Sequence, residues 1–114
     1  MRYAMAAAKP GGSDVIRKIE LGAMSLSAED VLIRHDAIGL NFLDIYIRNG
    51  AYPWPVETDL VLGSEGAGVI EAVGRNVKGL AVGDRVGYAL ANGAYASHRL
   101  ICLLYTSPSP RDLH

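Results

Sequence analysis

LVLGSEGAGVIEAVG, residues 60–74, is the stretch of this sequence that decides the fold. Its apolar and β-branched residues are typical of a strand, yet glycine interrupts them at positions 63, 66, 68 and 74. Glycine inside a strand indicates a bulge, a sharp corner or the close approach of another backbone segment. The stretch therefore predicts a strand that bends at the corner of a small β-barrel.

The same glycines invite comparison with a dinucleotide-binding loop, and we reject that interpretation. The phosphate-binding pattern Gly-x-Gly-x-x-Gly lies between a strand and the N-terminus of a helix. Here the spacing is reversed, and residues 69–73 continue as a β-type run. The glycines predict backbone shape and not a phosphate site.

Short runs of β character lie on both sides of this stretch. The chain has 114 residues, 13 of them glycine, and no pattern for long helices. The turn cluster at residues 10–14 predicts an opening hairpin. We predict strands over residues 2–8, 15–21, 31–38, 83–88 and 93–101. The fold is expected to be mainly β.

Residues 41–49 form the one segment with a helical pattern. Asn41 is a good N-cap, and Asp44 places a negative charge in the first turn, where the free N–H groups favour it. Gly50 is a natural end for this helix. The prolines in the Tyr-Pro-Trp-Pro sequence at residues 52–55 predict an extended loop after it.

Composition excludes several classes of function. The chain has 11 basic and 12 acidic side chains, a formal net charge of −1 and no run of Lys or Arg. Nothing therefore predicts binding to nucleic acid or to an anionic membrane surface. No apolar stretch approaches the roughly 20 residues that span a bilayer, so we expect a cytoplasmic protein. Cys102 is the only cysteine, which excludes an internal disulfide and a cysteine-based zinc cluster.

The composition changes at Cys102. Residues 102–112 read CLLYTSPSPRD, in which the prolines oppose regular structure. The string resembles the in-frame translation of a sequencing adaptor, and a disordered natural tail is the alternative. We expect one domain over residues 1–101 and an unstructured tail over 102–114. On the adaptor interpretation, neither Cys102 nor His114 has a function.

Four segments together resemble the medium-chain dehydrogenase/reductase superfamily. They are KPGG at 9–12, GLNFLDIYIRNGAYP at 39–53, LGSEGAGVI at 62–70 and AVGDRV at 81–86. More narrowly, they resemble its zinc-free quinone oxidoreductase branch, the relatives of zeta-crystallin. The resemblance covers residues 1–101 and implies the family's N-terminal catalytic domain, a GroES-like, partly open β-barrel with one short helix. The family's doubly wound cofactor domain would follow, so we expect an N-terminal fragment that is inactive alone.

The resemblance bears on metal binding. In the zinc-dependent members, a Cys before the short helix and a His after a glycine hold the metal, and the corresponding residues here are Asn41 and Ser64. An amide and a hydroxyl are poor zinc ligands, so we expect no metal. We expect His35 and His98 to be hydrogen-bonded or solvated strand residues. The acidic position of Glu65 neighbours the active site in the family, and a direct role for it stays open.

The family's activity would be the NADPH-dependent reduction of a quinone or a related conjugated carbonyl. Helical spacing places Asn41 and Arg48 on one face, and only the resemblance adds two tyrosines. Amide, phenol and guanidinium groups can stabilise an oxyanion as hydride arrives. The expected catalytic residues are Asn41, Tyr46, Arg48 and Tyr52, and the expected cofactor-binding residues are Asn41, Phe42 and Asp44.

Two alternatives stay open. The same domain serves zinc-free enoyl and alkenal reductases. A stand-alone GroES-like barrel is also compatible with a co-chaperonin or another non-enzymatic binding module. For the full-length protein the family implies a homodimer, formed through the cofactor domain, while the fragment alone is compatible with a monomer.

Overall fold

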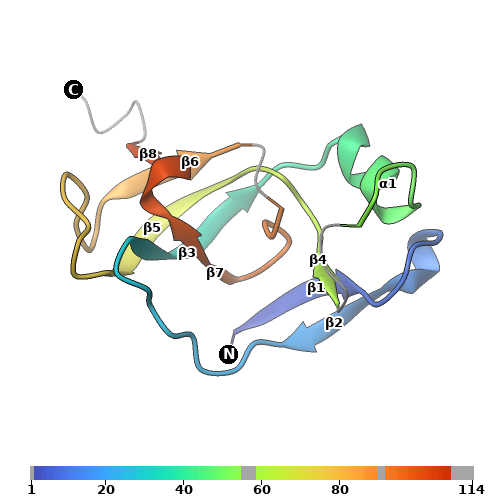
Figure 1. Ribbon diagram of the computed structural model, residues 1–114, viewed down its shortest axis with the longest axis horizontal. Coiled ribbons are helices and arrows are strands. Elements are labelled where there is room, and N and C mark those ends of the chain that lie inside the picture. The colour runs from blue at the N-terminus through green and yellow to red at the C-terminus, as the bar shows by residue number, and fades with distance from the viewer. Residues whose placement is uncertain (1, 55–58, 90–91, 109–114) are drawn as a thin grey trace.

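The computed structural model describes residues 2–54, 59–89 and 92–108. Within these ranges the chain forms two antiparallel sheets with one short α-helix at one end (Figure 1). No helix in the described ranges is long and apolar enough to cross a membrane. The mainly β prediction is confirmed, and the two sheets do not close into a barrel.

The smaller sheet has the strand order β2-β1-β4. It joins β1 (Tyr3–Ala7), β2 (Ile16–Glu20) and β4 (Leu60–Val61). The turn between the first two strands contains a 3-10 helix at Ser13–Val15. The predicted opening hairpin is therefore confirmed, with strand ends within two residues of those expected.

The larger sheet has the order β7-β3-β5-β6-β8. The central strand is β5, and β3 pairs with it along its length. The five strands are β3 (Asp30–Ile38), β5 (Gly66–Val73), β6 (Arg85–Tyr88), β7 (His98–Cys102) and β8 (Ser107–Pro108). The glycine-rich stretch of the sequence thus contributes β4, the bend after it and the central strand of the larger sheet.

Gly68 shows why this stretch needs glycine. It pairs with His35 beside a register irregularity in β3. A Cβ atom at this position would overlap the carbonyl oxygen of Arg34 on the neighbouring strand. The predicted close backbone approach is therefore confirmed, and β3 and β5 can pair in this register only when residue 68 has no side chain.

The hydrophobic core lies on one face of the larger sheet. Its largest fully buried members there come from the alternate, inward-facing positions of three paired strands, as expected for a sheet with one packed face. Burial of each such side chain contributes about 1.5–3 kcal/mol. These residues are Val31, Ile33, Ile70 and Val86.

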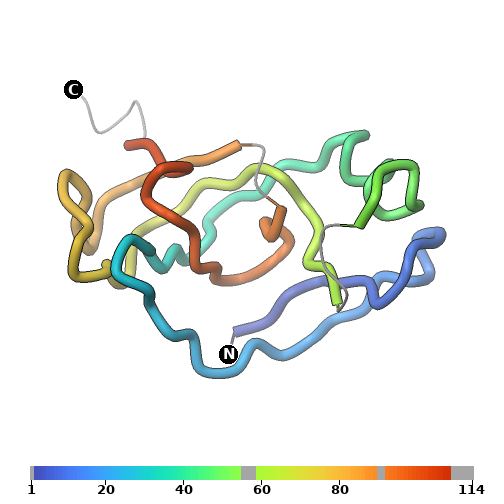
Figure 2. Tube along the Cα trace, viewed as in Figure 1, coloured from blue at the N-terminus to red at the C-terminus, as the bar shows by residue number. Residues whose placement is uncertain are grey.

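The segment at residues 93–97 differs from the sequence prediction. We predicted one strand over 93–101, but β7 begins only at His98. The preceding segment passes between the two sheets, as the orange part of Figure 2 shows. Its backbone accepts hydrogen bonds from Met5 in β1 (to Tyr95 O, 2.7 Å) and from His35 in β3 (to Ser97 O, 2.8 Å). The prediction was wrong here because this segment bonds to strands of two different sheets and does not pair along one neighbouring strand, although its side chains alternate as in a strand.

The chain after β7 continues along the larger sheet. Cys102 ends β7, Leu103–Tyr105 form a 3-10 helix, and Ser107–Pro108 pair with β6 at Val86 and Gly87. Residues 109–114, which include His114, lie outside the described residues. The expected domain boundary at residue 101 and the adaptor origin of residues 102–114 stay predictions.

Candidate functional site

Helix α1 (Phe42–Arg48) holds most of the predicted site residues. Asn41 is its N-cap, and the Asp44 carboxylate accepts the Asn41 backbone N–H at 3.1 Å. Gly50 ends the helix with a φ of 87°, which favours glycine. Beyond it, the Trp54 indole N–H donates to the Ile47 carbonyl at 2.9 Å and fixes the start of the following loop. The predicted helix and both of its ends are confirmed.

Asp44 is a buried carboxylate, only 4% exposed. One of its oxygens, Oδ2, accepts the Tyr95 hydroxyl at 2.7 Å as well as the Asn41 N–H. The other oxygen accepts the Ser64 hydroxyl at 3.5 Å. A buried charge requires such donors because it has lost its hydration. Through these bonds Asp44 connects α1 to the segment that contains Ser64 and to the segment that contains Tyr95, both distant in sequence.

The Tyr95 hydroxyl is held in its protonated form. Burial raises the pKa of Tyr95, and the neighbouring Asp44 charge raises this pKa further, while the charge of Arg48 has a smaller, opposite effect. A phenol that donates to a carboxylate keeps its proton because ionisation would place two negative charges together. Tyr95 is therefore a fixed hydrogen-bond donor to Asp44.

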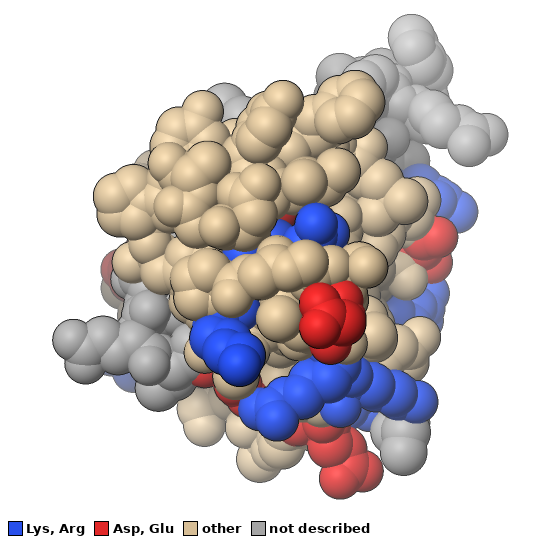
Figure 3. Space-filling model, turned by 90° about the vertical axis from the view of Figure 1, so that its right-hand side faces the viewer, with Lys and Arg blue, Asp and Glu red and all other residues tan. Residues whose placement is uncertain are grey.

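A groove of about 390 Å³ opens beside the start of α1. Its lining carries no formal charge, and two of its residues, Leu40 and Phe42, are 76% and 78% exposed. Figure 3 shows the same character at larger scale, because uncharged residues cover the upper part of this face, over α1. The groove is lined by Leu40, Asn41, Phe42, Ile45 and Tyr95.

The structure gathers only some of the predicted residues at this groove. Asn41 and Phe42 line it, and Asp44 lies buried behind it. Tyr52 lines a separate hollow with other residues of the helix and loop. Arg48 donates from Nε to the Gly11 carbonyl at 3.2 Å, which ties it to the first hairpin turn. Tyr46 is half-exposed on α1. The catalytic and cofactor-binding roles of all these residues stay predictions.

Sequence reasoning missed Tyr95 and Ser64 as partners of Asp44. Ser64 was considered only as a poor metal ligand. Tyr95 lies 51 residues after Asp44, and no local pattern connects the two. The one available signal was Gly63, which leaves room for the Tyr95 ring, and this signal has meaning only once the two segments are placed side by side.

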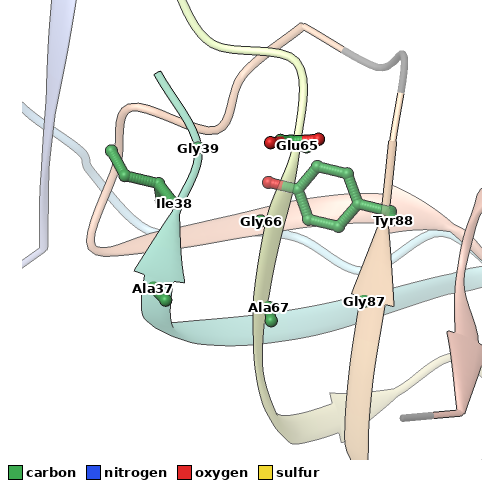
Figure 4. Close-up of a pocket in the computed structure, with 8 residues that line it drawn as sticks. All are labelled: Ala37, Ile38, Gly39, Glu65, Gly66, Ala67, Gly87 and Tyr88. Atoms are coloured by element: carbon green, nitrogen blue, oxygen red, sulfur yellow. The ribbon is translucent and has the colours of Figure 1, made fainter. Parts of the chain in front are cut away.

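A second hollow of about 360 Å³ lies where the ends of β3, β5 and β6 meet (Figure 4). Small residues form most of its lining, and Glu65 and Tyr88 supply its polar groups. The Tyr88 hydroxyl donates to His35 Nε2 at 2.7 Å, since His35 Nδ1 must donate to the Ala96 carbonyl at 2.8 Å. The hydrogen-bonded strand histidine that we predicted at position 35 is confirmed.

This histidine gives the fold a pH dependence. Burial lowers the pKa of His35 below its usual 6.5, and the charges of Arg99 and His98 lower it further. The hydrogen bond to Ala96 and the charge of Asp36 raise the pKa of His35, but they only partly offset the lowering. Between the folded and unfolded pKa values the unfolded chain binds more protons, so stability falls as the pH drops below about 6.5.

We expect this loss to stop once the pH lies below the folded pKa of His35. One group contributes a slope of at most about 1.4 kcal/mol per pH unit. Urea unfolding of the wild type between pH 7.5 and 5 measures it. The His35→Gln variant should show a flatter profile over the same range, and an unchanged slope in that variant would contradict the assignment.

Metal ligands do not cluster in the described ranges. No group of three or more His, Cys, Asp or Glu side chains there is arranged to hold an ion. His98, the other histidine singled out from the sequence, contacts Ser97 Oγ at 2.9 Å and Glu71 at 3.3 Å. It is hydrogen-bonded within its strand environment, as predicted.

Comparison with known proteins places this geometry in a family. The model of the alcohol dehydrogenase GroES-like domain matches residues 27–104, more than half of the chain. The chain belongs to this family. It is 42% identical over 90 residues to the quinone oxidoreductase of Salmonella typhimurium, covering 78% of this chain and 27% of that protein. It is also 42% identical over 95 residues to quinone oxidoreductase 1 of Escherichia coli, covering 82% and 29%.

Solved structures agree with these relatives. The Escherichia coli quinone oxidoreductase in complex with NADPH matches with a TM-score of 0.90 and 35% identity, over 98% of this chain and 34% of that one. The CurK enoyl reductase matches with a TM-score of 0.82 and 26% identity, over 99% and 36%. The resemblance to the quinone oxidoreductases is confirmed. The GroES-like chain described here spans about a third of the length of these relatives.

Proposed function

We propose that residues 1–101 supply the substrate side of an NADPH-dependent quinone reductase. The single observation that carries this proposal is the uncharged groove at the start of α1, in a chain whose relatives are named quinone oxidoreductases. The proposed substrate is a quinone or a related conjugated carbonyl. The 114 residues span about a third of these relatives, and we expect them to be inactive by themselves.

The groove fits the nicotinamide end of NADPH. It has the apolar walls and few polar groups that favour a planar heterocycle, and its lining holds no charged residue to bind phosphates. Asn41 and Phe42 would hold the ring, with Asp44 fixing the turn that presents Asn41. When bound, NADPH supplies the hydride for the reaction.

The other residues act on the substrate in this proposal. Tyr46, Tyr52 and Arg48 present phenol and guanidinium groups on or just after α1. Such donors stabilise negative charge that develops on the quinone oxygen, which is an interaction made more strongly in the transition state than in the ground state. Asn41 orients the two reactants, so no covalent intermediate with the protein is required.

The test is a fusion in which residues 1–101 replace the matching part of the Escherichia coli quinone oxidoreductase. We expect the fusion to oxidise NADPH in the presence of a quinone, and the purified 114-residue chain to give no such oxidation. In the fusion, Asn41→Ala should lower kcat/KM about tenfold or more, and Tyr52→Phe should lower kcat about tenfold, because each removes a donor to the reacting groups.

Arg17→Ala is the matched control for these variants. Arg17 on β2 forms an exposed ion pair with Asp59 at 3.1 Å. It does not line the groove or the hollow that contains Tyr52, so its loss should leave kcat/KM unchanged. A fusion that folds and binds NADPH but reduces no quinone would contradict the proposal. So would an Asn41→Ala variant that retains full activity.

A reductase of conjugated alkenes is the second candidate. The fold match to the CurK enoyl reductase favours it, although the sequence identity is lower than for the quinone oxidoreductases. Rates of the fusion on a quinone and on an enal, measured side by side, separate the two. We further propose a homodimer for the complete enzyme and a cytoplasmic location, with which a single free cysteine is compatible.

A further inference from the structure

We propose that Tyr95 is an additional ligand-binding residue of the groove, whose hydroxyl oxygen accepts a hydrogen bond from the carboxamide N–H of the nicotinamide ring. The proposal rests on the proposed function for the identity of the ligand. Asp44 is the positioning residue, because it fixes the direction of the Tyr95 hydroxyl.

The first argument concerns the single hydrogen of the hydroxyl. Tyr95 donates that hydrogen to Asp44 Oδ2 at 2.7 Å, and the carboxylate makes the bond stronger than one to a neutral acceptor. A phenol with its hydrogen committed in this way presents only lone pairs to anything else. At the groove, Tyr95 is therefore an acceptor and cannot serve as a proton donor to the substrate.

The second argument concerns the rigidity of the Tyr95 ring. Gly63 has a φ of 90°, and a Cβ atom there would overlap the ring, so the ring occupies the space that glycine leaves. The Tyr95 backbone is held on both sides, since its N–H donates to Leu62 O at 2.8 Å and its carbonyl accepts from Met5. The acceptor is thus preorganised before any ligand arrives, which reduces the entropic cost of binding.

The third argument selects the ligand group. Both oxygens of a quinone are acceptors, and a quinone oxygen placed at Tyr95 would face lone pairs. The nicotinamide carboxamide carries two N–H donors and matches the acceptor. Tyr95 also shares the groove with Asn41 and Phe42, the residues that we assign to the cofactor. Tyr95 therefore favours the nicotinamide over the quinone at this position and leaves proton donation to other groups.

The test uses the 114-residue chain and two small probes of similar shape. Nicotinamide carries the carboxamide, while 3-acetylpyridine replaces its NH₂ with a methyl group. Dissociation constants come from shifts of the groove resonances in ¹H–¹⁵N spectra at millimolar probe concentrations. We expect nicotinamide to bind about three- to tenfold more tightly than 3-acetylpyridine, the range for one net hydrogen bond.

Tyr95→Phe should bring the two dissociation constants to about the same value. The ring remains against Gly63 in this variant, so the fold is retained. Asp44→Asn should also reduce the preference, because a neutral amide holds the Tyr95 hydrogen less firmly. Tyr3→Phe is the matched control: Tyr3 lies on β1 with Lys18 over its ring, and the preference should be unchanged.

Equal affinities of the wild type for the two probes would overturn the proposal, and this comparison needs no variant. A preference that persists in Tyr95→Phe would overturn it as well. Activity of the fusion on quinones is a separate measurement. An active fusion without a carboxamide preference would leave the proposed function intact and remove the role of Tyr95.

Discussion

Gly68→Ala is expected to cause a large loss of folding stability. The added methyl group would overlap the Arg34 carbonyl oxygen on the adjacent strand, and backbone atoms in the middle of a sheet cannot move aside cheaply. We expect a loss of about 3 kcal/mol or more, a large part of the stability of a domain of this size. Thermal and urea unfolding followed by circular dichroism measure the change.

Gly87→Ala is the matched control for this variant. Gly87 lies on β6, next to β5, and the nearest atom to an added Cβ is Gly66 O at 3.6 Å, an ordinary contact. Its stability should change by less than about 1 kcal/mol, in either direction. Equal losses for the two variants would show that strand glycines matter here through flexibility and not through close approach.

The sequence predicted the parts of the fold that are determined by residues close in sequence. Local signals were sufficient for the close backbone approach at Gly68, for the hairpin and for the helix that begins after Asn41, because each is marked by residues close in sequence. The course of residues 93–97 could not be predicted, since its hydrogen bonds go to two sheets at once. The glycine-rich strand and the family resemblance predicted a partly open β-barrel, and the two sheets do not close into a barrel.

Asp44→Ala is expected to destabilise the chain by about 3 kcal/mol. The variant leaves three donors without their acceptor: the Asn41 N–H, the Tyr95 hydroxyl and the Ser64 hydroxyl. Buried donors that lose their partner cost about 1–3 kcal/mol each, and the half-buried Tyr95 can recover part of this through water. Guanidinium unfolding of the 114-residue chain gives the value.

Two variants bracket this result. Asp44→Asn keeps one acceptor oxygen and should lose only about 1–2 kcal/mol. Asp36→Ala removes an exposed carboxylate that lies 3.7 Å from Arg85, and its effect should stay within about 0.5 kcal/mol. If Asp44→Ala were no worse than Asp36→Ala, the buried network would contribute nothing to stability.

The candidate site was predictable only as far as it is local. Asn41, Phe42 and Asp44 belong to one helical turn, and the structure places them at or directly behind one groove. Arg48 shares a helical face with Asn41 in principle, yet its Nε is bound to the Gly11 carbonyl of the first hairpin. Tyr95 reaches the site from a distant segment, and no spacing rule within one element could identify it.

The segment between the two sheets also sets an order of events during synthesis. The Tyr3 backbone N–H donates to Ser97 Oγ at 2.9 Å, across 94 positions of sequence. A ribosome adds about 5–20 residues per second, so the first strand waits roughly 5–20 s for this partner. During that interval the hairpin can form, but the contacts that residues 93–97 make with both sheets cannot. Assembly of the nascent domain is therefore late and cooperative, because long loops must close before their contacts form.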